Sequence, residues 1–260
     1  MSTSVVYPYA KINIGLHVIE KRADGYHNIE TVFYPVSMHD ILDVTDAPEA
    51  GREAALFTYG LDIPGDPYGN LCMKAYRLLA ADFPLTPVEI HLYKNIPMGA
   101  GLGGGSSDAA FCIQLLNKHF GLNLTHAQLM HYALQLGSDV PFFLQPLPPA
   151  AYLAGGRGDL LTPIPLGLRN YRIELRFPPV SVSTAEAYAG IIPQRRDVGL
   201  RERLLQPVDT WKCIVSNDFE NTIFEKYPVI RSYKEALYDE GAVYASMTGS
   251  GSAVFGLFRI

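Results

Sequence analysis

The chain reads Pro97-Met98-Gly99-Ala100-Gly101-Leu102-Gly103-Gly104-Gly105-Ser106-Ser107-Asp108 between an alternating apolar segment at 88–93, which predicts a strand, and a helical pattern at 109–120. Glycine has no Cβ and tolerates positive φ, so the backbone N–H groups of such a loop can converge on an anion. A helix that starts directly afterwards adds free N–H groups and the positive end of its dipole. Five glycines between 99 and 105 are more than a simple connection needs. The pattern therefore predicts a phosphate-binding loop.

Two common kinds of phosphate loop do not fit this stretch. Gly99, Gly101 and Gly104 satisfy G-x-G-x-x-G, but a dinucleotide-binding fold also needs a second strand that ends in an acidic residue about 20 positions later. Here residues 120–124 lead into another predicted helix instead. A Walker A loop fails because Gly105 occupies the position of its lysine. The sequence therefore argues against both classes.

The rest of the chain mixes strand and helix patterns. The first 60 residues are rich in strands, and a proline-rich stretch at 146–149 is the best candidate for a domain boundary. We predict strands at 12–19, 29–36, 41–44, 54–59, 88–93, 171–177, 242–247 and 253–258, and helices at 70–83, 109–120, 125–136, 184–189, 219–224 and 229–238. Asn70 and Thr125 are the expected N-caps of the helices that start there. This order predicts an α+β protein with an N-terminal domain at 1–148 and a C-terminal domain at 149–260.

Composition limits the class of protein. The 260 residues are 48% hydrophobic and 18% charged, which is typical of a globular protein and not of a disordered one. The net charge of −5 argues against a nucleic-acid binder. We expect the three separated cysteines to be small buried hydrophobes in a reducing compartment. Neither a signal-peptide pattern nor an apolar run of about 20 residues is evident, so we expect a cytoplasmic protein.

The glycine loop and its paired serines resemble the phosphate-binding motif of the GHMP kinases, named for galactokinase, homoserine kinase, mevalonate kinase and phosphomevalonate kinase. Ala-Lys-Ile-Asn at 10–13, Asp-Gly-Tyr-His at 24–27, Gly-Ser-Asp-Val-Pro at 137–141 and the glycine-rich 248–255 extend the resemblance from about residue 10 to 258. It implies a two-domain α+β fold with the active site in the interdomain cleft. It also implies ATP as co-substrate, accompanied by Mg²⁺, without a Walker A lysine.

The first three of these segments resemble one branch of the family. That branch phosphorylates a hydroxyl of a cytidine-diphosphate polyol in the non-mevalonate route to isoprenoid precursors. The resemblance implies a small-molecule kinase that is a monomer or weak homodimer and binds neither nucleic acid nor membrane. Two alternatives stay open: a GHMP kinase with another acceptor, such as homoserine or mevalonate, and a catalytically silent relative that binds nucleotide. Asp-Gly-Tyr-His speaks against the first, and Lys11 with Asp139 against the second.

The resemblance implies roles for individual residues. Asp139 is the expected general base, although an aspartate shortly before Pro141 could instead cap a turn. Lys11 is the expected partner that keeps this carboxylate ionised and favours the developing alkoxide. The expected ATP-binding residues are Pro97, Met98, Gly99, Ala100, Gly101, Leu102, Gly103, Gly104, Gly105, Ser106 and Ser107.

Further positions are implied for the cytidine-diphosphate substrate. The expected substrate-binding residues are Asn13, Tyr26, His27, Thr184 and Tyr188. Tyr26 and Tyr188 would stack on the two faces of the cytosine, and His27 would hydrogen-bond its edge. Thr184 could also be a helix cap. No carboxylate can be identified from the sequence as a metal ligand. Asp108 occupies a position where the family often has asparagine.

Overall fold

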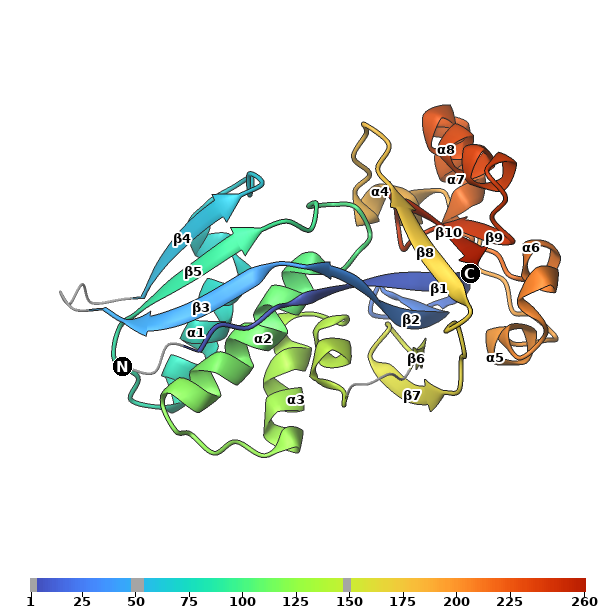
Figure 1. Ribbon diagram of the computed structural model, residues 1–260. Helices are drawn as coiled ribbons and strands as arrows, with labels where there is room; N and C mark the ends of the chain where they lie inside the picture. Colours follow the sequence, from blue (N-terminus) through green and yellow to red (C-terminus); the bar gives the residue numbers. More distant parts are fainter. Residues whose placement is uncertain (1–3, 48–53, 147–150) are drawn as a thin grey trace. The chain divides into compact units, whose positions relative to one another are not determined.

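The computed structural model describes residues 4–47, 54–146 and 151–260 (Figure 1). These residues form two compact units that are interleaved in sequence. Unit 1 comprises Met1–Ala10, Ser37–Met98 and Gly103–Gln145, and unit 2 comprises Lys11–Val36, Gly99–Leu102 and Pro146–Ile260. The predicted boundary between residues 148 and 149 lies outside the described residues and stays a prediction.

Unit 1 has a three-stranded sheet in the order β3-β5-β4, and three helices pack beside it (Figure 1). Strand β5 is antiparallel to β3 and parallel to β4. Helix α2 contacts β3 and both other helices. The strands are β3 (Ile41–Asp46), β4 (Ala55–Gly60) and β5 (Val88–Lys94), the helices are α1 (Leu71–Asp82), α2 (Gly104–His119) and α3 (His126–Leu136), and the 3₁₀ turns are η1 (Pro67–Gly69) and η2 (Val140–Leu144).

The helix starts in unit 1 follow from their capping residues. Asn70 Oδ1 accepts the Cys72 N–H at the start of α1 (2.8 Å). Thr125 and Gln128 form a reciprocal capping box at the start of α3. Both predicted caps are confirmed. Helix α2 begins at Gly104 and not at 109 as predicted, because the last glycines and the serines of the loop form its first turn.

Unit 2 contains two sheets, in the orders β1-β2-β6-β7 and β8-β10-β9 (Figure 1). Strand β10 is antiparallel to both β8 and β9, and helix α8 contacts β9 and β10. The strands are β1 (Tyr9–Lys21), β2 (His27–His39), β6 (Ala151–Gly155), β7 (Leu160–Ile164), β8 (Tyr171–Arg176), β9 (Tyr244–Met247) and β10 (Val254–Arg259). The helices are α4 (Thr184–Ala189), α5 (Leu200–Leu204), α6 (Trp211–Ile214), α7 (Phe219–Lys226) and α8 (Pro228–Asp239), with a 3₁₀ turn η3 (Val208–Thr210).

A buried apolar cluster joins β1 to the helices of unit 2. Leu16 and Val18 pack with Phe219 of α7 and with Ile230 and Leu237 of α8. Burying one such side chain contributes about 1.5–3 kcal/mol. The predicted α+β architecture is confirmed, but β6 and β7 were not predicted. Strand β7 contains Pro163, which an edge strand tolerates because its N–H need not join a ladder.

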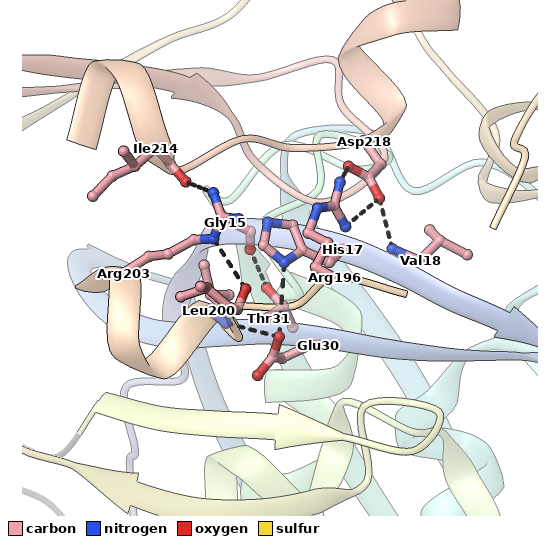
Figure 2. Close-up of polar contacts among 11 residues, drawn as sticks. Gly15, His17, Val18, Glu30, Thr31, Arg196, Leu200, Arg203, Ile214 and Asp218 are labelled. Carbon is pink, nitrogen blue, oxygen red and sulfur yellow. Dashed lines mark hydrogen bonds and ion pairs between the residues drawn. The ribbon is translucent and has the colours of Figure 1, made fainter. Parts of the chain in front are cut away.

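Polar contacts hold the segment around α5 beside β1 and β2 (Figure 2). The Glu30 carboxylate accepts the Leu200 N–H (2.8 Å), and the Asp218 carboxylate accepts the Val18 N–H (2.8 Å). Fully buried His17 lies with Nδ1 3.7 Å from Glu30 Oε2. These side chains therefore brace the sheet strand that carries Lys11 and Asn13.

Among the described residues, no helix is both long and apolar enough to cross a membrane.

Candidate active site

The glycine loop has a backbone that requires glycine. Gly99, Gly101 and Gly103 have φ of +65°, +74° and +69°, a region that side chains with a Cβ rarely adopt. A Cβ on Gly101 would lie 2.0 Å from the Thr248 carbonyl oxygen, and one on Gly104 would lie 2.9 Å from Lys94 Nζ. At Gly101 and Gly104 the loop is thus shaped by close approaches of backbone and side chain that a Cβ would block.

The first turn of α2 presents free donors. By helix geometry, the N–H groups of its first residues have no intrahelical acceptor, and the Gly103 N-cap offers no side chain to bind them. The first helical hydrogen bond in this turn runs from the Ser107 N–H to the Gly103 carbonyl (2.9 Å). Ser107 is buried, and its hydroxyl has no hydrogen-bond partner among the described residues. This helix end suits a phosphate group.

A pocket of about 280 Å³ in unit 1 adjoins the loop. Met98, Gly105 and Asp108 line one part of it, and β4, η1 and the start of α1 line the rest. The other lining residues are Leu56, Thr58, Ile63, Pro64, Gly65, Asp66, Pro67, Gly69, Asn70 and Leu71. Such a mixture of apolar walls and a few polar groups fits the nucleoside end of a nucleotide.

A buried ionic cluster lies directly behind this helix start. Lys94 at the end of β5 contacts the carboxylate of Asp40 and that of Asp108, the latter at 2.8 Å. Asp40 also accepts the N–H groups of Asn95 (2.6 Å) and Ile96 (2.8 Å), and it thereby holds the entry to the loop. Lys94 and Asp40 were not predicted from the sequence. The available signal was a lysine that ends an alternating strand immediately before the glycine loop.

Burial dominates the chemistry of Asp108. Desolvation raises the pKa of its carboxyl to about 7, although Lys94 opposes the shift. Desolvation alone would lower the pKa of Lys94, but the two carboxylates outweigh it and the pKa is raised. Asp108 Oδ1 has no hydrogen-bond partner among the described residues. A charged cluster of one lysine and two aspartates therefore lies beneath the predicted phosphate site.

In unit 2, β1 brings Lys11 and Asn13 to the glycine loop. Lys11 Nζ donates to Asn13 Oδ1 (2.6 Å) and to the Gly101 carbonyl (3.3 Å). The Lys11 N–H donates to the Leu102 carbonyl (3.0 Å), and its ammonium lies 4.9 Å from the centre of the Phe33 ring. Lys11 and Asn13 are both buried, with 3% and 2% of their surfaces exposed. Lys11 therefore contacts the loop, and the two predicted residues contact each other.

The glycine-rich turn after β9 packs against the same loop. Thr248 Oγ1 accepts the Asn13 N–H (2.9 Å) and donates to the Gly101 carbonyl (3.0 Å). Asn217 Nδ2 donates to the carbonyls of Met247 (2.9 Å) and Gly249 (2.8 Å), which fixes the turn from beneath. The resemblance to the GHMP kinases included this motif, but Thr248 and Asn217 were not predicted as its supports.

Of the predicted cytosine-binding residues, His27 and Tyr188 form a stacked pair, and Tyr26 is a separate exposed ring. The rings of His27 and Tyr188 stack with centroids 4.7 Å apart at 17°. Desolvation lowers the pKa of His27, and nearby Lys21 adds to this effect. Tyr26 is 56% exposed, and the Arg157 guanidinium lies 4.9 Å from the centre of its ring. Arg157, in the turn between β6 and β7, was not predicted.

Two local capping hypotheses have different outcomes. The N-cap of α4 is Ser183, whose hydroxyl accepts the Glu186 N–H (3.1 Å), so the cap suggested for Thr184 is wrong. Thr184 Oγ1 lies 3.5 Å from Ser250 Oγ in the glycine-rich turn. Asp139 occupies the N-cap position of η2, but its side chain makes no capping hydrogen bond. The carboxylate of Asp139 is therefore not explained by capping.

The cysteine expectation is correct for two residues and wrong for the third. Cys72 and Cys112 are buried in α1 and α2, whereas Cys213 is exposed. Cys213 lies on the four-residue helix α6, in which Trp211 is the buried residue and Cys213 faces away from the core.

Comparison with known proteins agrees with this geometry. Residues 70–145 match the family model "GHMP kinases N terminal domain", and residues 202–259 match "GHMP kinases C terminal". A 4-diphosphocytidyl-2-C-methyl-D-erythritol kinase of Bacteroides thetaiotaomicron is 53% identical, over 98% of this chain and 92% of that protein. The protein of the same name from Cytophaga hutchinsonii is 46% identical, with the same coverage of 98% and 92%.

Solved structures give the same result. A crystal structure of 4-(cytidine 5'-diphospho)-2C-methyl-D-erythritol kinase matches with a TM-score of 0.77 and 33% identity, over 98% of this chain and 90% of that one. The mevalonate kinase of Methanococcus jannaschii matches with a TM-score of 0.65 and 14% identity, over 99% and 91%, which is a likeness of fold alone. The chain therefore belongs to the GHMP kinase family and, within it, to the family of the 4-diphosphocytidyl-2-C-methyl-D-erythritol kinases.

Proposed function

We propose that the protein transfers the γ-phosphoryl group of ATP to a hydroxyl of 4-diphosphocytidyl-2-C-methyl-D-erythritol, a step of the non-mevalonate route to isoprenoid precursors. One observation carries the proposal at the site. The Lys11 ammonium, 3.3 Å from the Gly101 carbonyl, stands at a glycine loop that leads into a helix N-terminus. A buried cation beside a phosphate loop suits phosphoryl transfer, in which charge builds up on the transferring group.

Residues 97–107 are proposed to hold the phosphates of ATP, and the pocket beside Met98 its nucleoside. The left-handed glycines keep the loop backbone close to the ligand, and the first N–H groups of α2 face a charge that they stabilise. The Ser107 hydroxyl, which has no partner in the described part of the chain, fits a phosphate oxygen or the Mg²⁺ that accompanies ATP. Bound Mg²⁺ would neutralise charge on the phosphates.

The chemical step needs little covalent help, so position and charge are expected to supply most of the rate. The substrate hydroxyl oxygen attacks the γ-phosphorus, and the bond to the β-phosphate oxygen breaks as ADP leaves. We assign the transferred hydroxyl proton to the Asp139 carboxylate. Lys11 stabilises negative charge in the same step.

The cytidine end is proposed to bind at Tyr26, His27, Thr184 and Tyr188, and the polyol at Asn13. The stacked pair of His27 and Tyr188 supplies a flat aromatic surface with a ring nitrogen at its edge. Tyr26 supplies a second, exposed ring. Such surfaces suit a pyrimidine better than an amino acid such as homoserine. We further propose that the protein is cytoplasmic, monomeric or weakly dimeric, and binds neither nucleic acid nor membrane.

The test is ATP turnover with a panel of acceptors. ADP release and the ³¹P NMR spectrum of the product are measured with the cytidine-diphosphate polyol, homoserine and mevalonate. We expect rapid turnover with the first acceptor alone, and loss of this turnover in Lys11→Met. Faster phosphorylation of homoserine or mevalonate would replace the proposed substrate. Nucleotide binding without turnover of any acceptor would favour the catalytically silent alternative.

A further inference from the structure

A chain of buried hydrogen bonds continues from Lys11 into the sheet. Asn13 Oδ1 accepts from Lys11 Nζ (2.6 Å), and Asn13 Nδ2 donates to Thr31 Oγ1 on the neighbouring strand β2 (3.0 Å). Thr31 Oγ1 in turn donates to the Gly15 carbonyl (2.6 Å), a contact that Figure 2 shows. Thr31 is fully buried, so water does not compete for these partners. No role was predicted for Thr31 from the sequence.

The direction of each bond in this chain is determined. The Gly15 carbonyl can only accept, so the single hydroxyl proton of Thr31 is committed to it. Thr31 Oγ1 can then only accept from Asn13, which places the amide NH₂ toward Thr31 and Oδ1 toward Lys11. A rotated amide would turn its NH₂ toward the Lys11 ammonium, and two donors would then face each other. Thr31 therefore determines which end of the Asn13 amide meets Lys11.

The backbone of β1 supports the arrangement. Gly15 has φ of +67° inside a strand, and a Cβ there would lie 2.6 Å from Leu200 Cδ1. This glycine conformation interrupts the regular strand two residues after Asn13. The same residue supplies the carbonyl that takes the Thr31 proton. The polarity of the chain thus starts from a backbone carbonyl, which can only accept.

We propose that Thr31 is a positioning residue, which orients the Asn13 amide and through it the Lys11 ammonium at the glycine loop. This inference rests on the proposed catalytic role of Lys11. It assigns the function of the buried hydroxyl to orientation and not to packing. Valine has nearly the same shape as threonine but cannot accept from Asn13, whereas serine can accept. The two substitutions therefore separate packing from hydrogen bonding.

The first test compares Thr31→Val with Thr31→Ser by kcat, KM and melting temperature. We expect Thr31→Val to lower kcat roughly 10- to 100-fold with the KM for ATP nearly unchanged, because a misoriented group costs rate more than binding. Thr31→Ser should recover most of the rate. Thr162→Val, an exposed change in β7, is the matched control. Parental kcat in a folded Thr31→Val protein would overturn the inference, and Thr31→Ala serves the same comparison if the valine variant does not fold.

The second test is a double-mutant cycle with Asn13→Ala. If Thr31 acts through Asn13, Thr31→Val should cost little further kcat once the amide is absent. If the decreases in kcat of the two single variants multiply in full in the double variant, Thr31 acts through packing and the inference is overturned. Lys11→Met tests the role of Lys11 separately from that of Thr31. Parental kcat in Lys11→Met would refute the proposed role of Lys11, whereas its loss beside an unaffected Thr31→Val would refute only the positioning role.

Discussion

Gly101→Ala is the most direct perturbation of the glycine loop. Gly101 has φ of +74°, and an added Cβ would lie 2.0 Å from the Thr248 carbonyl oxygen and 3.0 Å from its carbon. A clash with backbone cannot be relieved by rotating a side chain, so the loop has to move. Movement of Gly101 also disturbs its carbonyl, which accepts from both Lys11 Nζ and Thr248 Oγ1.

The size of the effect follows from these contacts. The left-handed backbone costs a residue with a Cβ about 1–2 kcal/mol, and each weakened hydrogen bond costs about 0.5–1.5 kcal/mol. Together they predict a loss of about 2–5 kcal/mol in the free energy of unfolding. A domain of this size loses roughly 2–4 °C of melting temperature per kcal/mol, so the decrease should be at least about 4 °C. A displacement near 1 Å should also lower kcat by about 100-fold.

Gly105→Ala is the matched control for stability on the same loop. Its φ is not in the left-handed region, and the nearest atom to an added Cβ is Leu71 Cδ1 at 3.7 Å. Gly105 lies in the first turn of α2, where alanine favours the helix by up to about 1 kcal/mol. We expect an equal or higher melting temperature for this variant, measured by circular dichroism. If Gly101→Ala melts with the parent protein and keeps its kcat, the close approach to Thr248 is refuted.

Three further predictions concern the base, the buried cluster and the aromatic pair. Asp139→Asn should lower kcat by about 100-fold or more without the loss of stability that a lost helix cap would cause, since its side chain makes no capping bond. Near-parental kcat would move the base elsewhere. Because the pKa of Asp108 is raised to about 7 from 3.8, the folded state retains this proton longer, and its contribution to stability should fall as pH rises from about 4 to 7. Asp108→Asn should flatten this dependence of the free energy of unfolding on pH, measured by urea titrations at several pH values. An unchanged pH dependence would assign it to other groups. Tyr188→Ala should raise the KM for the cytidine substrate, because it removes a stacking face that contributes about 1–3 kcal/mol to binding. Tyr188→Phe keeps the ring stacked on His27 and should change the KM much less. Equal increases in KM for the two variants would implicate the hydroxyl.

Much of the fold and part of the site could be predicted because their signals are local. The caps at Asn70 and Thr125 depend on residues two or three positions away, and both were predicted correctly. Lys11 and Asn13 alternate with apolar residues of one strand, so their common face follows from the period of a strand. The glycine loop reveals itself because positive φ and close backbone approach exclude most other residues.

Contacts between distant residues had no comparable signal. Lys94 meets Asp40 and Asp108 across 54 and 14 positions, and Thr248 meets Gly101 across 147. A single sequence predicts that such residues exist but not which partner each will find, because that depends on how strands and turns are placed in the tertiary structure.

The sequence by itself determined the class of site: a glycine loop before a helix start, with a lysine and an asparagine on one strand face. Only the tertiary structure decided how those groups are oriented. The reason is that a buried hydrogen bond needs both a donor and an acceptor at about 3 Å, and strand pairing brings them together. Thr31 is the clearest case, because only the placement of β2 beside β1 sets its hydroxyl between Asn13 and the Gly15 carbonyl.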